Sequence, residues 1–138
     1  MAGLEYIPKT ARNALILHND IGVLSAMQAA AAHQGFTPIV CRDLPTALLA
    51  MAQHRFDLCI LPVSISEKTD GWALAAVLHM CFPHAFIAMI APEPDLLMLQ
   101  TAINTGVTQL YLSSRPAAEL ALEIVRDCSG NAPSGKLQ

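Results

Sequence analysis

An uncharged apolar run at Leu58–Leu61, closed by a proline, constrains the fold of this chain more than any other feature. The run shows no alternation of apolar and polar residues, which is typical of a strand buried on both faces in the middle of a parallel sheet. Pro62 ends the run, because a proline has no N–H group to offer to a central strand. In open α/β sheets the functional groups lie at the carboxyl ends of such strands. Here that position holds Pro62, which can do almost no chemistry.

Five apolar runs of strand length alternate along the chain with five segments of helical periodicity. The predicted strands are Ala14–Leu17, Phe36–Cys41, Leu58–Leu61, Ala85–Ala91 and Gln109–Leu112. This alternation predicts an α/β fold, a single doubly wound (βα)5 domain whose parallel five-stranded sheet is covered on both faces. The flavodoxin-like strand order 2-1-3-4-5 fits a chain of 138 residues. Pro38, near the start of the second run, indicates that this strand lies at an edge.

Capping residues mark the ends of the predicted helices. Asp20 stands before a helical pattern that Gly35 stops, and Asp43 precedes a helix with a proline in its first turn. A later helix begins at Leu96 and is stopped by Gly106, and the last one is predicted from Ala117 to about Asp127. We therefore expect carboxylates at helix starts to act as caps, and Asp20 to be a cap rather than a metal ligand.

Length and composition predict one domain at residues 12–128, with a lead-in at 1–11 and a flexible tail or linker at 129–138. Hydrophobic residues make up 54% and charged residues 14%, so we expect a packed core and some apolar surface that serves a partner. A net charge of −3 without a Lys/Arg cluster argues against direct nucleic-acid binding. No apolar stretch reaches the roughly 18 residues of a membrane span, and no signal-peptide pattern opens the chain. We expect a cytoplasmic protein that does not enter membranes.

Four scattered cysteines offer no C-x-x-C pair, and we expect small buried hydrophobic residues in a reducing compartment. They are Cys41, Cys59, Cys81 and Cys128. No clustered Cys/His spacing indicates a metal site, and no G-x-G-x-x-G or Walker A motif indicates a nucleotide cofactor. No nucleophile and base stand in a catalytic pattern, so we expect a protein without enzyme activity or catalytic residues.

Four segments, in this order, resemble the receiver domain of bacterial response regulators. They read L-I-L-H-N-D-I-G-V-L, H-R-F-D-L-C-I-L-P, D-G-W-A-L and L-Y-L-S-S-R-P, and the resemblance covers about Arg12 to Cys128. It implies a flavodoxin-like fold and a role in two-component, phosphorelay-type signal transduction. In that family an acidic pair after the first strand helps to hold Mg²⁺, and an aspartate ending the third strand accepts phosphate from a histidine kinase. A Ser or Thr after the fourth strand and a Lys–Pro after the fifth contact the phosphoryl group.

The chain departs from the family pattern after its first and third strands. His18 and Asn19 stand where the acidic pair is expected, with Asp20 as the next residue. One carboxylate beside an asparagine is a poor Mg²⁺ site, so Mg²⁺ binding is expected to be lost or weak. We expect His18 to be a strand-end histidine with a satisfied hydrogen bond. Pro62 occupies the aspartate position, so no phosphoacceptor is expected there, and Asp57 opens the third strand at its other end.

The chain also departs from the family pattern at the ends of its fourth and fifth strands. Ile90 stands where the Ser or Thr is expected, followed by Ala91. Either Ser114 takes the lysine position, or Arg115–Pro116 stands in for Lys–Pro, with a guanidinium in place of an ammonium. The degenerate pocket predicted in this way consists of His18, Asn19, Asp20, Pro62, Ile90, Ser114 and Arg115.

Four consecutive apolar residues, Leu96–Leu99, wrap most of a turn of the fourth predicted helix, so at least one of them, Leu96 or Met98, is expected to face outwards. In the family, the surface of the fourth helix, fifth strand and fifth helix is a frequent dimer or effector surface. Tyr111 matches an aromatic residue that swings on activation there; with Ile90 in place of its partner, we expect Tyr111 to be a fixed interface residue. The expected partner is a protein or an output domain, and homodimer formation through the same surface is one form of this contact.

These observations predict a pseudo-receiver, an atypical receiver domain that acts as a phosphorylation-independent protein-interaction module. One alternative is a true response regulator that uses an unusual phosphoacceptor, for which Ser64 and Ser66 are the nearest hydroxyls. The other is a flavodoxin-like module that binds a small molecule or an anion near Asn19, Ser64, Ser114 and Arg115.

Overall fold

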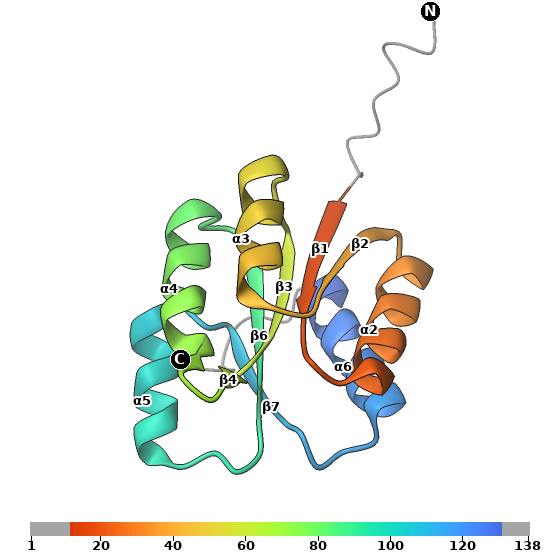
Figure 1. Ribbon diagram of the computed structural model, residues 1–138. Coiled ribbons are helices and arrows are strands. Elements are labelled where there is room, and N and C mark those ends of the chain that lie inside the picture. Colours follow the sequence, from red (N-terminus) through yellow and green to blue (C-terminus); the bar gives the residue numbers. More distant parts are fainter. Residues whose placement is uncertain (1–11, 131–138) are drawn as a thin grey trace, which may run out of the picture.

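A computed structural model of the chain describes residues 12–130, and these form an α/β domain of three layers (Figure 1). The strands of the main sheet are β1 (Arg12–Leu17), β2 (Phe36–Cys41), β3 (Leu58–Pro62), β6 (Phe86–Ala91) and β7 (Gln109–Leu112). The helices are α2 (Ile21–His33), α3 (Leu44–Gln53), α4 (Gly71–Cys81), α5 (Leu96–Thr105) and α6 (Ala117–Gly130). A short hairpin of β4 (Ser64–Ser66) and β5 (Thr69–Asp70) lies between β3 and α4.

The main sheet is parallel and has the order β2-β1-β3-β6-β7, which confirms the predicted doubly wound topology. β3 lies in the centre, and all five of its residues are buried. β2 lies at an edge, as its proline predicts, because Pro38 can occupy a position where no neighbouring strand needs its N–H group. Both faces of the sheet are covered, which explains why the strands are apolar without alternation.

Alternate strand residues point into two separate cores, one on each face of the sheet. Leu15 and Leu17 of β1 pack with α3, α4 and α5, whereas Ala14 and Ile16 pack with α2 and α6. Figure 1 shows the same division, with α2 and α6 together on one side of the sheet and α3, α4 and α5 on the other. None of the helices within residues 12–130 has the length and hydropathy needed to cross a bilayer.

Helix ends follow the predicted capping pattern. The carboxylate of Asp20 accepts a hydrogen bond from the backbone N–H of Val23, and Asp43 does the same for Thr46. Asp95 caps α5 through the N–H of Met98. Gly106 ends α5 with a φ of 82°, a left-handed conformation that favours glycine.

Several boundaries differ from the sequence predictions. The structure adds the β4–β5 hairpin where a loop is predicted, β1 begins at Arg12 instead of Ala14, and β6 begins at Phe86 instead of Ala85. β3 extends through Pro62 instead of stopping at Leu61, because its pairing with β1 ends at Ile60 and Pro62 pairs with β6 alone. α6 continues to Gly130, so Ser129 and Gly130 are helical and do not belong to a tail that begins at residue 129. The lead-in at 1–11 and the remaining tail at 131–138 lie outside the described residues.

Candidate functional site

Strands β1, β3, β6 and β7 are neighbours in the sheet and run in the same direction, so their carboxyl ends meet at one edge. In doubly wound folds this is where ligands bind and where reactive side chains are placed. We call this region the carboxyl edge; it comprises residues 18–20, 62, 90–91 and 113–115. The sheet therefore brings all residues of the predicted degenerate pocket to the same edge.

After β1, residues 18–20 of the carboxyl edge form hydrogen bonds with other groups of the same chain. Nδ1 of His18 accepts a hydrogen bond of 3.0 Å from the N–H of Asp20, which confirms the predicted satisfied histidine. Burial lowers the pKa of His18 below its ordinary value, and the Asp20 carboxylate opposes this shift only in part. The Asp20 carboxylate accepts the N–H of Val23 at 3.1 Å, so it is a helix cap as predicted. The exposed Asn19 contributes its carbonyl oxygen to a long, 3.5 Å contact with the Arg42 guanidinium.

After β3, the backbone closes tightly around Pro62. Pro62 is buried and pairs in register with Ile90. The N–H of Val63 donates to the carbonyl of Ile90 at 3.0 Å, and the N–H of Gly71 donates to the carbonyl of Val63 at 2.6 Å. A Cβ atom at residue 71 would overlap the carbonyl oxygen of Pro62, so only glycine allows α4 to start this close to the strand. Pro62 therefore sits in a closed position and presents no donor or nucleophile.

The β4–β5 hairpin follows Pro62 directly and was not predicted. Ile65 anchors it, being only 7% exposed, while Ser64 and Ser66 on either side are exposed. The Ser64 hydroxyl donates to the carbonyl of Ser66 at 3.3 Å, so it is used inside the hairpin. The sequence signal for this element is the polar–apolar–polar alternation of Ser64–Ser66, which is too short to stand out among the longer apolar runs.

Asp70, the last residue of the hairpin, also serves as a cap. Its carboxylate accepts hydrogen bonds from the N–H groups of Trp72 and Ala73, at 3.0 and 3.4 Å. Both Asp20 and Asp70 are therefore occupied at helix starts. Within residues 12–130 no group of three or more His, Cys, Asp or Glu side chains is placed to hold a metal ion.

After β6 and β7, apolar and paired groups complete the edge. Ile90 is 3% exposed and belongs to the core on the α2/α6 face, and Ala91 accepts the N–H of Ser113 through its carbonyl at 2.8 Å. Ser114 is exposed. The Arg115 guanidinium forms an ion pair with Glu123 of α6, so this cation turns towards the helix. Neither Ser114 nor Arg115 presents a free ammonium-like charge to the end of β3.

The three residues predicted for an interaction surface differ in their exposure. Leu96 is 73% exposed, as predicted, and its neighbour Leu97 is 70% exposed, whereas Met98 is half-buried. Tyr111 is only 5% exposed, and its hydroxyl donates to the Asp127 carboxylate at 2.7 Å. Burial and this hydrogen bond raise the pKa of Tyr111. Tyr111 is therefore fixed, as predicted, but it offers almost no surface to a partner, so Leu96 and Leu97 are the accessible residues.

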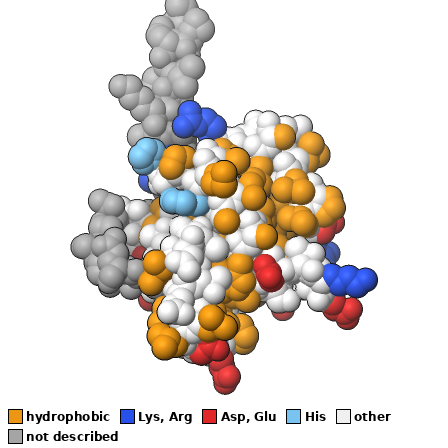
Figure 2. All heavy atoms as spheres, turned by 90° about the vertical axis from the view of Figure 1, so that its left-hand side faces the viewer, with side chains coloured by type: hydrophobic (Ala, Val, Ile, Leu, Met, Phe, Trp, Pro, Cys, Tyr) orange, Lys and Arg blue, Asp and Glu red, His pale blue; other side chains and the backbone are white. Residues whose placement is uncertain are grey.

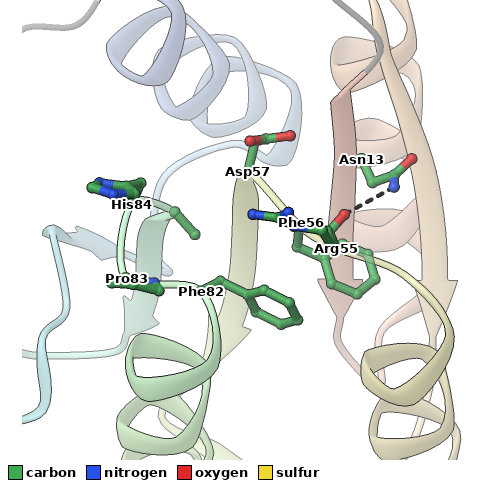
Figure 3. A pocket seen from close by; sticks show the side chains of 8 residues that line it. Asn13, Arg55, Phe56, Asp57, Phe82, Pro83 and His84 are labelled. Atoms are coloured by element: carbon green, nitrogen blue, oxygen red, sulfur yellow. Dashed lines mark hydrogen bonds between the residues drawn. The ribbon is translucent and has the colours of Figure 1, made fainter. Parts of the chain in front are cut away.

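A pocket that the sequence did not predict lies at the opposite, amino edge of the sheet (Figure 3). It has a volume of about 280 Å³ and is lined by Asn13, Arg55, Phe56, Asp57, Phe82, Pro83, His84 and Ala85. The Asn13 amide donates to the carbonyl of Arg55 at 2.8 Å, and this bond ties β1 to the loop before β3. Asp57 lies at this edge, as predicted, and its backbone pairs with both Asn13 and Phe86. The pocket is built from loops far apart in sequence, so no local pattern signals it.

The cysteines follow the prediction in part. Cys41 and Cys59 are buried, but Cys81 is exposed at the end of α4 and Cys128 is half-buried on α6. Burial raises the pKa of the Cys128 thiol to about 11, which keeps it protonated near neutral pH. The expectation of four buried cysteines is therefore wrong for Cys81, because it lies in the last turn of a helix whose outer side is open to solvent.

Comparison with solved structures finds receiver domains. The receiver domain protein (CheY-like) of Methanospirillum hungatei JF-1 has a TM-score of 0.74 at 15% identity, covering 91% of this chain and 99% of that chain. The chemotaxis response regulator CheY4 of Vibrio cholerae has a TM-score of 0.73 at 18% identity, covering 86% and 98%. A response regulator of Burkholderia pseudomallei, solved with a phosphorylated aspartic acid, a calcium ion and citrate, has a TM-score of 0.71 at 13% identity, covering 88% and 71%.

These similarities establish the flavodoxin-like fold of receiver domains for this chain. Comparison of the sequence with protein-family models and with curated proteins gives no match. The chain therefore shares the fold of these structures at sequence identities of 13–18%.

Proposed function

We propose that the chain is a receiver-like module of phosphorelay-type signal transduction that works by protein contact, without accepting a phosphoryl group. The fold similarity to receiver domains supports the signalling role, and the composition of the carboxyl edge supports the loss of phosphoryl chemistry. The expected partner is another protein or an output domain.

The observation that carries this proposal is the buried Pro62 at the end of the central strand. Phosphoryl transfer to a protein needs a nucleophilic side chain at the position of attack. The Burkholderia pseudomallei structure contains a phosphorylated aspartic acid. Here the strand end carries a buried proline, which offers no nucleophile.

The acidic residues around the carboxyl edge point the same way. A bound Mg²⁺ needs near-octahedral oxygen ligands, commonly from one or two carboxylates together with water. Asp20 and Asp70 already accept backbone N–H groups at the starts of α2 and α4. Recruiting them for a metal would uncap both helices at about 1 kcal/mol each.

The proposed contact surface consists of α5, β7 and α6. Leu96 and Leu97 of α5 and Leu112 of β7 are all at least 39% exposed. Exposed neighbouring hydrophobic side chains such as Leu96 and Leu97 commonly mark protein contacts. Arg115, the cation that an anion-binding pocket would need, is already paired with Glu123, so the small-molecule alternative has less support.

Intact-mass measurement after incubation with Mg²⁺ and acetyl phosphate tests the proposal. CheY4 of Vibrio cholerae, a chemotaxis response regulator by name, serves as the positive control. We expect the control to gain the mass of a phosphoryl group and this chain to gain none. An adduct on this chain would contradict the proposal, and peptide mapping to Ser64 or Ser66 would support a response regulator with an unusual phosphoacceptor instead.

A further inference from the structure

The outer surface of α3, α4 and α5 carries no formal charge. Residues 44–53, 71–81 and 96–105 contain no Asp, Glu, Lys or Arg, and His79 is the one titratable histidine among them. The three helices cover the same face of the sheet. We call this surface the uncharged face.

Large hydrophobic side chains are concentrated on the uncharged face. Within residues 12–130, eleven large hydrophobic side chains are exposed, and all but Ile21, Leu112 and Leu122 lie on these three helices. Those on the face are Leu48, Leu49, Val77, Met80, Leu96, Leu97, Leu99 and Ile103. Figure 2 looks onto this side of the molecule and shows groups of hydrophobic side chains, with Lys and Arg side chains near the margins and an acidic side chain between the hydrophobic groups. Patches of this extent on a folded chain usually mark a contact.

The helices on the other face of the sheet show what a solvated surface looks like in this chain. α6 presents Glu119, Glu123 and Arg126, and its exposed Leu122 stands alone among them. α2 is also uncharged, but its second half is mostly alanine, and Ile21 is its one large exposed hydrophobic residue. Low charge alone therefore does not produce an apolar patch; α3, α4 and α5 combine low charge with large side chains.

A groove between α3 and α4 on the uncharged face can accommodate a large side chain. It has a volume of about 170 Å³ and is lined by Leu44, Leu48, Thr69, Asp70, Ala73, Leu74 and Val77. The lining is almost entirely apolar. Met80, which is 79% exposed on α4, and Leu49, 59% exposed on α3, are the kind of side chain that fits such a groove.

We infer that the uncharged face binds a second copy of this chain in a two-fold symmetric dimer. The eight exposed side chains together offer an area on the order of the ~800 Å² that each partner buries in a standard interface. A two-fold contact places each surface against its own copy, so like charges on it would repel. The three helices contain no charged residue within their bounds, and Asp70, which lines the groove, has its carboxylate held at the start of α4 by the N–H groups of Trp72 and Ala73. Met80 or Leu49 of each copy then enters the α3–α4 groove of the other.

Other occupants match the uncharged face less well. An anionic membrane is attracted by Lys and Arg side chains, and these helices have none. The large hydrophobic residues of segments 1–11 and 131–138 are Met1, Leu4, Tyr6, Ile7 and Leu137, fewer than the eight exposed side chains that such a segment would have to cover. The inference does not depend on the proposed function, because it follows from the uncharged face whether or not the carboxyl edge accepts a phosphoryl group.

Light scattering coupled to size exclusion, over a range of protein concentrations, tests the dimer on the full chain. The double variant Leu48→Lys/Met80→Lys adds two charges to the uncharged face. Its matched control, Ile21→Lys/Ala29→Lys, adds the same two charges at exposed positions of α2, on the other face of the sheet. We expect the wild type and the control to be dimers and the face variant to be monomeric, with a dissociation constant raised at least about 100-fold.

Three results would overturn the inference. They are a wild type that stays monomeric at every concentration, a control that dissociates as readily as the face variant, and a monomer that dimerises only after removal of residues 1–11. If the face variant does not fold, hydrogen exchange of the wild type decides. Amides of α3 and α4 must become better protected as the protein concentration rises, and unchanged protection would rule out the dimer.

Discussion

The carboxyl edge and the uncharged face differ in whether the chain satisfies its own interactions. At the edge, His18, Asp20 and Asp70 all hydrogen-bond to nearby backbone, and Arg115 pairs with Glu123. On the uncharged face, eight large hydrophobic side chains remain in contact with water. The polar groups named at the edge find hydrogen-bonding or ionic partners within the chain, whereas the exposed parts of the hydrophobic side chains of the face have no packing partner within residues 12–130.

This difference indicates where a function resides if, as we propose, this receiver-like fold does not carry out phosphoryl chemistry. A reactive site needs polar groups that are free to engage a substrate or metal, whereas at the carboxyl edge the His18 ring and the Asp20 carboxylate accept backbone N–H groups and Arg115 pairs with Glu123. A contact surface needs apolar area that gains free energy on burial, at about 25 cal/mol per Å². The uncharged face supplies that area. Substitutions at the carboxyl edge and in the core on the α2/α6 side can test, through the free energy of unfolding, how tightly each of these regions is packed.

The largest expected effect is at Gly71, where α4 meets the carboxyl edge. In Gly71→Ala the new Cβ overlaps the Pro62 carbonyl and lies 3.0 Å from the Met89 side chain, so the helix start must move. We expect the free energy of unfolding to fall by about 3 kcal/mol or more, measured by urea denaturation. Gly130→Ala is the control, because nothing lies within 4 Å of its added Cβ. Equal stability of the two variants would show that the edge is looser than this packing implies.

A second test restores a carboxylate to the edge. Pro62→Asp places a carboxylate at a buried strand end, and Pro62→Asn places a neutral side chain of the same shape there. We expect the aspartate variant to be less stable than the asparagine variant by about 2–4 kcal/mol, because a buried charge without a partner is costly. Urea denaturation with and without Mg²⁺ measures this difference. Recovery of the lost stability by Mg²⁺ would mean that the edge still assembles a metal site.

A substitution of Tyr111 tests the core on the α2/α6 side of the sheet, where the side chain is buried within the chain. Tyr111→Phe removes the hydrogen bond to Asp127 that joins β7 to α6. We expect a loss of about 1–2 kcal/mol in the free energy of unfolding, since the bond is nearly buried and its acceptor is a carboxylate. Thr101→Val is the control, because it removes an exposed hydroxyl that bonds only within its own helix, to Leu97. Its effect is expected to stay within about 0.5 kcal/mol. A Tyr111→Phe variant as stable as the wild type would contradict the fixed position of this ring.

The smallest effect is expected from His18, as a dependence of stability on pH. Burial lowers the pKa of His18 in the native state, so the unfolded chain takes up a proton at a higher pH than the native chain. The free energy of unfolding should therefore fall as the pH decreases below about 6.5 and level off once the native histidine is also protonated. His18→Asn keeps an acceptor for the Asp20 N–H but does not titrate. We expect the stability difference between wild type and variant to change with pH only in this window, and a constant difference from pH 5 to 8 would contradict the burial of His18.

The sequence predicts the order of elements and the polar ends of the helices well, because these depend on local physics. Apolar strand runs and Asp20 or Asp43 as caps each act within a few residues, and the structure confirms them. The outward sides of α4 and α5 were harder to predict. Charged residues normally mark the solvent side of a helix, and these helices have none, so Met98 could not be distinguished from Leu97. The sequence predicts Tyr111 at an interface, whereas the structure buries it. Its hydrogen bond to Asp127 joins residues on separate elements, and sequence spacing does not reveal such a bond.

Thermal unfolding of the full chain with and without Mg²⁺ plus beryllofluoride tests the central claim most directly. Any species that binds the native state alone raises the unfolding temperature, and beryllofluoride with Mg²⁺ occupies the site of a phosphoryl group. CheY4 of Vibrio cholerae is the comparison protein and is expected to be stabilised. For this chain we predict no change in the unfolding temperature, because the carboxyl edge has no free carboxylate pair and ends β3 in Pro62. A clear rise would contradict the account and show that the edge still binds a phosphoryl group.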